Sequence, residues 1–133
     1  MNRKTFLKHS LLFTAASLGG ASLTSCSLFD EPEMELCMAS EIAKNQFRSF
    51  VFNRRKILVR NDGDQFVIFS LICTHKRCTV AYQPEENIFE CPCHEGTYDR
   101  EGRVIDGPPP GPLRRFAYEI REGKLFVLNK AMI

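Results

Sequence analysis

Cysteine and histidine are concentrated in one short stretch of this chain, and this stretch constrains the fold more than any other feature. Four of the six cysteines and two of the three histidines lie between residues 73 and 94. They form two groups, Cys73-Thr74-His75 followed by Cys78, and Cys91-Pro92-Cys93-His94. Each group follows a run of apolar residues that predicts a strand, so each presents its side chains from a loop. Two neighbouring hairpins would bring one cysteine and one histidine each to the same place.

Thiol and imidazole groups in this pattern suit three kinds of chemistry. Two thiolates and two imidazoles can hold a 2Fe-2S cluster, with thiolate on one iron and imidazole on the other. The same four groups can hold structural zinc, although the C-x-H group is a poor match to the usual zinc pairs. In an exported protein the four cysteines can instead form two disulfides. The residues alone leave all three open.

The rest of the chain predicts an all-β domain. Short apolar and aromatic runs are separated by turn sequences such as Asn61-Asp62-Gly63-Asp64 and Glu122-Gly123. The expected strands are residues 47–52, 56–60, 66–71, 88–91, 102–105, 116–120 and 124–128. Residues 39–45 are expected to be a brief helix or loop. Many short strands with frequent turns indicate an antiparallel β-sandwich or small barrel.

The segment Gly107-Pro108-Pro109-Pro110 is expected to be a rigid loop. Proline lacks the amide donor that a central strand needs, so this segment cannot join a sheet in the ordinary way.

The N-terminal segment has the pattern of an export signal. Residues 1–8 carry three basic residues, and residues 10–24 are apolar or small. Leu23-Thr24-Ser25-Cys26 resembles the site at which bacterial lipoproteins are cleaved and acylated. We therefore expect residues 1–25 to be a signal peptide and Cys26 to carry a lipid that anchors the chain to a membrane. Residues 26–38, a segment rich in acidic residues, are expected to be a tether, which leaves residues 39–133 as one small domain.

Two alternatives remain open for this segment. Residues 9–29 carry no formal charge, so they can also be an uncleaved N-terminal membrane helix. Residues 2–8 resemble the twin-arginine export motif, with Lys4 in place of its second arginine. General secretion and twin-arginine export both place the domain in the periplasm or at the cell exterior, where disulfides are stable. The chain after the signal carries 15 basic and 16 acidic residues, so it lacks the excess of positive charge that is typical of nucleic-acid-binding domains.

The two cysteine-histidine groups, together with Tyr98-Asp99 and the Gly107-Pro108-Pro109-Pro110 loop, resemble the Rieske iron–sulfur family from about residue 39 to residue 128. The resemblance implies a 2Fe-2S cluster with four ligands: Cys73, His75, Cys91 and His94. It implies that Cys78 and Cys93 form a disulfide, as in the membrane-complex branch of the family. It also implies that Tyr98 donates a hydrogen bond to a ligand sulfur and that the proline loop covers the cluster.

The implied function is one-electron transfer, as a subunit rather than a stand-alone enzyme. The first candidate is the iron–sulfur subunit of a membrane quinol–cytochrome oxidoreductase, with cytochrome b or c type subunits and quinol as partners. The alternatives are the small subunit of a periplasmic oxidase similar to arsenite oxidase, and a structural zinc-binding lipoprotein.

The chain departs from the family at two places. Lys76-Arg77 replaces the Leu-Gly pair of quinol-oxidising members, which favours either an acidic partner or a plain exposed loop. Gly96 replaces a serine that donates to a bridging sulfide in high-potential members. We expect a lower potential than theirs, and Gly96→Ser to raise it by about 60–130 mV, from the usual worth of a hydrogen bond to a charged group.

Overall fold

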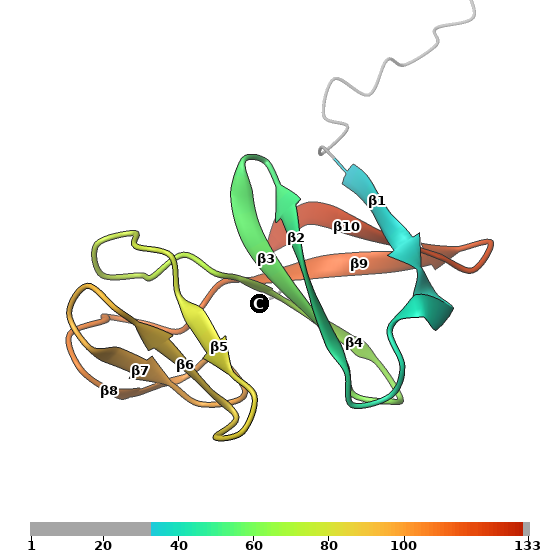
Figure 1. Cartoon of the computed structure of the whole chain (residues 1–133). Helices are drawn as coiled ribbons and strands as arrows, with labels where there is room; N and C mark the ends of the chain where they lie inside the picture. The colour runs from blue at the N-terminus through green and yellow to red at the C-terminus, as the bar shows by residue number, and fades with distance from the viewer. Residues whose placement is uncertain (1–32, 132–133) are drawn as a thin grey trace, which may run out of the picture.

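The computed structural model describes residues 33–131 and consists of two antiparallel sheets. The larger sheet has six strands in the order β1-β10-β9-β4-β3-β2 and curls into a nearly closed barrel, and the smaller has four in the order β5-β6-β7-β8 (Figure 1). The elements are β1 (Glu33–Met38), a 3-10 helix (Ala39–Glu41), β2 (Phe47–Phe52), β3 (Arg55–Asn61), β4 (Phe66–Ser70), β5 (Ala81–Gln83), β6 (Ile88–Cys91), β7 (Gly96–Tyr98), β8 (Val104–Asp106), β9 (Arg115–Arg121) and β10 (Lys124–Ala131).

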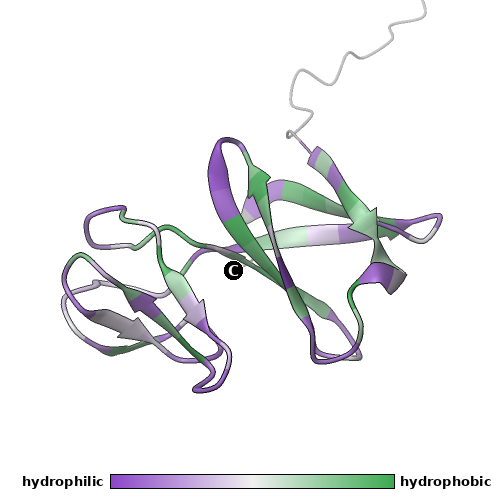
Figure 2. Cartoon of the chain, in the orientation of Figure 1, coloured by the Kyte–Doolittle hydropathy of each residue, from purple (hydrophilic) through white to green (hydrophobic). Residues whose placement is uncertain are grey.

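Strands β3 and β4 are buried on both faces, which explains their nearly continuous apolar sequence. Alternate residues of a strand point to opposite faces. Ile57 and Val59 accordingly join the core inside the barrel, whereas Leu58 joins a second core on the side of the smaller sheet. Figure 2 shows the matching hydropathy, with the apolar colour concentrated in the middle of the barrel strands and the polar colour on most loops.

The smaller sheet is inserted in sequence between β4 and β9, and the second core attaches it to the barrel. This core joins Phe69 of β4 to Phe89 of β6 and Tyr98 of β7, all of which are fully buried. The rings of Phe69 and Phe89 lie 5.0 Å apart between centroids. The loops of the smaller sheet are therefore held against a rigid base.

A buried arginine adds a polar connection between the two sheets. Arg60 of β3 is 3% exposed and donates to Asp62 at 2.7 Å and to the carbonyl of Arg100 at 2.6 Å. It also reaches Glu101 at 3.3 Å. Because residues 100 and 101 lie in the turn between β7 and β8, this network links the β3–β4 hairpin to the smaller sheet.

The all-β expectation is confirmed, with one change at the start of the domain. Residues 33–38, expected to belong to a tether, form the edge strand β1 and pair with β10. The strand expected at 102–105 is shifted to β8. Strands β5 and β7 were missed, because each is only three residues long and β7 begins at a glycine. The expected signal peptide and Cys26 lie outside the described residues.

Among residues 33–131, no helix combines the length and the apolar character required to cross a bilayer.

Candidate metal centre

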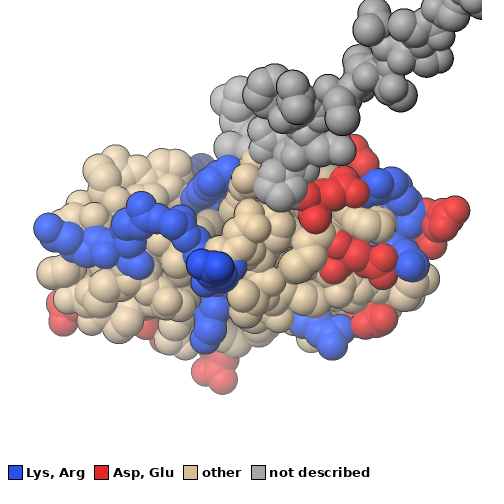
Figure 3. Space-filling view, turned by 90° about the horizontal axis from the view of Figure 1, so that it is seen from above, with Lys and Arg blue, Asp and Glu red and all other residues tan. Residues whose placement is uncertain are grey.

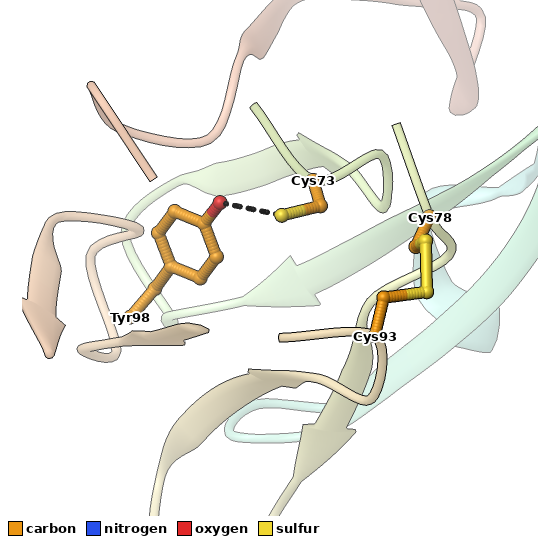
Figure 4. Close-up of a disulfide and its surroundings, with 4 residues drawn as sticks. All are labelled: Cys73, Cys78, Cys93 and Tyr98. Carbon is orange, nitrogen blue, oxygen red and sulfur yellow. Dashed lines mark hydrogen bonds between the residues drawn. A yellow bond between two sulfur atoms is a disulfide. The ribbon is translucent and has the colours of Figure 1, made fainter. Parts of the chain in front are cut away.

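The six residues singled out in the sequence lie at the end of the molecule that the smaller sheet forms, five of them in two loops and Cys91 at the end of β6. One loop lies between β4 and β5, where the backbone N–H of Cys73 donates to the carbonyl of Cys78 at 2.8 Å and so closes a tight turn. The other lies between β6 and β7 and contains Cys93 and His94. A disulfide between Cys78 and Cys93 ties the loops together (Figure 4), which confirms the expected pairing.

The two remaining loop cysteines are free and buried. Cys73 and Cys91 are each 2% exposed, and their side chains contact each other. Burial raises the pKa of Cys73, but hydrogen bonds from Tyr98, from the His75 and Lys76 N–H groups and from Cys91 outweigh it and lower the pKa overall. Burial raises the pKa of Cys91, and the hydrogen bond from the Cys93 N–H offsets this only in part. Cys73 is thus the first of the pair to become a thiolate, the form that binds metal.

The two imidazoles lie close to each other, one in each of the two loops. The rings of His75 and His94 are 4.9 Å apart between centroids and nearly perpendicular. Removal from water lowers the pKa of His75, and His94 and Lys76 lower it further by charge repulsion. This favours the neutral imidazole that serves as a metal ligand.

One ring nitrogen of His75 lacks a hydrogen-bond partner in the described part of the chain although it is buried, which indicates a metal ligand. Its Nδ1 atom is buried and has no hydrogen-bond partner among the described residues. A buried polar atom without a partner costs roughly 1–3 kcal/mol. Coordination to iron would remove this cost, so the residues present fit the group that the sequence implied.

Thr74 links the first ligand loop by hydrogen bonds to Tyr98 of β7 and to the end of the proline loop. Thr74 donates its hydroxyl proton to the carbonyl of Gly111 at 2.7 Å and its N–H to the Tyr98 hydroxyl at 3.2 Å. The Tyr98 proton then has two acceptors, the Thr74 hydroxyl oxygen at 3.2 Å and the Cys73 sulfur at 3.3 Å (Figure 4). A thiolate at Cys73 makes Tyr98 the donor, because charge-assisted hydrogen bonds are the stronger ones.

The role of Thr74 was not anticipated from the sequence. A threonine between two ligands gives no local signal for a contact with a carbonyl 37 positions away.

Gly96 stands where the proline loop packs against the ligand loops. A Cβ atom added there would lie 2.6 Å from Cγ of Pro109, and one added at Gly107 would lie 2.8 Å from Cα of Gly96. Gly107 also has φ +87, a conformation that glycine adopts readily. The two glycines therefore allow the backbones to touch. The expectation that Gly96→Ser merely adds a hydrogen-bond donor needs correction, because the site has no room for the side chain.

We expect Gly96→Ser to displace the proline loop and to destabilise the protein. Overpacking of a filled site costs about 1–3 kcal/mol, measured here as the free energy of urea unfolding. Gly111→Ser is the matched control in the same loop, because a Cβ there meets no atom within 4 Å. Pro109→Ala removes the clashing Cγ atom and should recover part of the loss in the double variant. Equal stability of Gly96→Ser and Gly111→Ser would contradict this packing.

The fold and the site together define a class: a small β protein that offers two thiols and two imidazoles from paired loops, an arrangement suited to a binuclear iron cluster. Comparison with protein families matches residues 33–117 to the Rieske [2Fe-2S] domain. The chain belongs to the Rieske family, whose cofactor is a 2Fe-2S cluster.

Curated relatives include the iron–sulfur subunits of two cytochrome-containing or cytochrome-reducing complexes. The cytochrome b6-f complex iron-sulfur subunit of Chlorobaculum tepidum is 34% identical over 95 residues, which is 71% of this chain and 52% of that protein. The menaquinol:cytochrome c reductase iron-sulfur subunit of Bacillus subtilis is 40% identical over 81 residues, or 58% and 48% of the two chains. This chain thus spans about half the length of these relatives.

Solved structures confirm the fold. The soluble domain of the Rieske protein II from Sulfolobus acidocaldarius aligns with a TM-score of 0.64 at 14% identity and covers 76% of this chain and 79% of that one. The plasma membrane Rieske protein of Synechocystis aligns with a TM-score of 0.59 at 20% identity and covers 71% and 97%.

Proposed function

We propose that this chain is a one-electron carrier that holds its 2Fe-2S cluster through Cys73, His75, Cys91 and His94, and that it serves as the iron–sulfur subunit of a membrane quinol–cytochrome oxidoreductase. The observation that carries the ligand assignment is the buried, unsatisfied Nδ1 of His75 in the loop that also supplies the free thiol of Cys73. When bound, such a cluster accepts and releases single electrons at roughly −150 to +300 mV.

The protein's own residues supply three things to this function. Cys73 and Cys91 are shielded from water, and Tyr98 is placed to donate to the Cys73 sulfur. The disulfide and the proline loop hold the two ligand loops in place. His94 is exposed, so the imidazole side of the site is open to an approaching redox partner.

Metal analysis of the purified full chain tests the ligand assignment. We expect about two irons and two acid-labile sulfides per chain and, after reduction, the EPR spectrum of mixed cysteine and histidine ligation. Cys73→Ser and His94→Leu should lose most of the iron, while Cys37→Ser should keep it, because Cys37 packs against the other core. A colourless protein with one zinc per chain would overturn the assignment and favour the zinc alternative.

The assembly proposal has a separate test. Subunits that copurify with the chain from membranes should include a b-type cytochrome. A molybdopterin subunit in its place would instead support the periplasmic oxidase alternative.

The membrane attachment that we propose rests on the N-terminal sequence alone. The basic residues 1–8, the apolar segment 10–24 and the Leu23-Thr24-Ser25-Cys26 pattern support a lipid on Cys26 at the outer side of a bacterial membrane. Mass spectrometry of the mature N-terminus tests this. Cys26→Ala should abolish acylation and membrane retention, whereas an intact Met1 at the N-terminus would favour the retained helix.

Tyr98→Phe is expected to lower the midpoint potential. A donor to a ligand sulfur stabilises the reduced, more negative state more than the oxidised one, and the hydrogen bond is worth about 1.5–3 kcal/mol. For one electron, this corresponds to a fall of at most about 60–130 mV. Redox titration of the loaded protein measures it. Tyr82→Phe is the matched control, because its hydroxyl bonds Asn87 away from the ligands, and an equal fall in both variants would contradict the assigned donor.

A further inference from the structure

Five exposed basic side chains without acidic partners lie in the first ligand loop and in the β2–β3 hairpin. Lys76 and Arg77 belong to the first ligand loop, and Arg54, Arg55 and Lys56 belong to the hairpin. Within residues 33–131, none of the five takes part in an ion pair. We call these five residues the basic strip.

The two parts of the basic strip are neighbours in the fold. The backbone N–H of Leu71 donates to the carbonyl of Lys56 at 3.0 Å, which fixes the turn end of the hairpin beside the segment that leads to Cys73. Lys56 also lines a groove together with Thr79, the residue after the disulfide cysteine Cys78. The strip therefore continues from the hairpin to the ligand loops.

Charge is distributed unevenly over this face of the molecule. Figure 3 shows a run of basic side chains from the left end to the middle of this face, whereas the right end carries acidic and basic side chains side by side. The acidic residues of β1 are ion paired, Glu33 with Arg121 and Glu35 with Lys124. Glu95, beside His94, is the acidic residue within the second ligand loop. On this face, positive charge is thus in excess from the β2–β3 hairpin to the first ligand loop, whereas Glu90 and Glu95 line a separate groove beside Cys91.

Two arginines of the strip occupy backbone conformations that favour glycine. Arg54 has φ 62 in the two-residue turn between β2 and β3, and Arg77 has φ 63 in the ligand loop. Side chains other than Gly, Asn and Asp rarely adopt these angles. Both positions carry a long cation where a smaller residue fits the backbone better, so neither arginine is explained by its local structure.

The centre of this surface is apolar and concave. A groove between the edge strands β2 and β5 is lined by Phe47, Val51 and Val80 as well as Lys56, and Val51 is 59% exposed. An apolar centre with a charged rim is typical of a protein interface. A concave surface receives a protruding side chain of a partner protein, whereas a flat bilayer contacts protrusions.

We propose that the basic strip is the docking surface for an acidic electron-transfer protein, which it brings against the imidazole side of the site. The inference rests on the proposed electron-carrier function and adds the charge of the partner. Unpaired charge at the docking face speeds encounter and selects partners of opposite sign.

Binding of two probes of opposite charge to the full chain tests this surface. The probes are plastocyanin, an acidic copper protein, and cytochrome c, a basic haem protein, both oxidised and mixed with the oxidised chain so that only association is measured by biolayer interferometry. We expect plastocyanin to bind at low salt and to lose about tenfold or more in affinity when salt shortens the screening length to about 8 Å. Cytochrome c should show no such binding.

Charge-neutral variants locate the interaction. Arg54→Gln/Arg55→Gln should weaken plastocyanin binding by about tenfold at low salt and slow one-electron reduction of plastocyanin by the reduced chain in stopped flow. Arg121→Gln/Lys124→Gln removes the same net charge at the opposite end of the molecule and should change both by less than about twofold. The iron content and the midpoint potential should stay unchanged in both variants, because neither touches the ligand loops.

Three results would separate the possible failures. Equal plastocyanin binding by Arg54→Gln/Arg55→Gln and the parent chain would overturn the docking surface. Binding of phosphatidylglycerol vesicles that depends on the strip, without plastocyanin binding, would overturn it in favour of a membrane contact. A chain without iron would refute the proposed function, whichever probe it binds.

Discussion

Arg60→Met is expected to lower the free energy of unfolding by about 3 kcal/mol, the largest effect of a single substitution outside the ligands. Loss of one partner of a buried ion pair typically costs about 3–5 kcal/mol, because the other charge stays behind. Asp62 and Glu101 keep 21% and 42% exposure, so water can compensate part of the loss and the lower end applies. Methionine retains most of the volume that packs on Phe69.

The matched control for Arg60 is an arginine in an exposed ion pair. Arg103 is 74% exposed and pairs with Asp99 at 2.8 Å, so Arg103→Met should cost less than about 1 kcal/mol. Urea unfolding of both variants measures the difference. Equal losses would show that the buried network stabilises the protein no more than an exposed ion pair does.

The effect of Arg60 also has a pH signature. The hydrogen bond from Arg60 lowers the pKa of Asp62 below its ordinary value of 3.8, and burial opposes this only in part. A carboxyl with a depressed pKa contributes stability above its unfolded pKa and loses it as the pH falls through the folded pKa. The difference in the free energy of unfolding between the parent chain and Arg60→Met should therefore be largest above about pH 4 and should become smaller below it.

The sequence predicted the larger sheet well because its strands follow simple burial rules. Strands β2, β3, β4, β9 and β10 each contain a clear apolar run, as does β6 of the smaller sheet, and their bounds differ from the expectation by a few residues. β1 was missed because the acidic residues Glu33 and Glu35, together with Pro32 just before them in the sequence, indicate a tether. These acidic side chains are stabilised by Arg121 and Lys124, which come from the other end of the chain. Such pairing cannot be inferred from local composition.

The candidate site was predictable in its residue types but not in its packing. Cysteine and histidine spacing, together with the family resemblance, singled out the ligands and the disulfide. Nothing local to Gly96 shows that Pro109 occupies the space a serine would need, and nothing local to Thr74 shows its bond to Gly111. Both depend on a loop that meets the ligand loops only after the smaller sheet has folded. A family resemblance therefore predicts which residues form the site more reliably than it predicts how tightly their surroundings are packed.

Removal of the Cys78–Cys93 disulfide should destabilise the protein by about 3 kcal/mol, because it closes a loop of 15 residues in the unfolded chain. The two ligand loops belong to different connections, and no strand pairing joins one loop directly to the other. Without the disulfide, the two loops are connected through the elements that flank them, namely the pairing of β5 with β6 and the contacts of Tyr98 in β7 with Cys73 and Thr74. Cys78→Ala/Cys93→Ala should therefore lower both the unfolding free energy and the retention of iron during dialysis against a chelator.

Cys37→Ala is the control for the disulfide variant, because Cys37 is a free, partly buried cysteine of β1 that packs on the barrel core. Loss of a small partly buried side chain there should cost about 1 kcal/mol or less, without faster loss of iron. Treatment of the parent chain with dithiothreitol should reproduce the double variant, and should leave the double variant itself unchanged. If the double variant keeps its iron as long as the parent chain does, the ligand loops are held by the tyrosine network and the proline loop, and the disulfide contributes only to global stability.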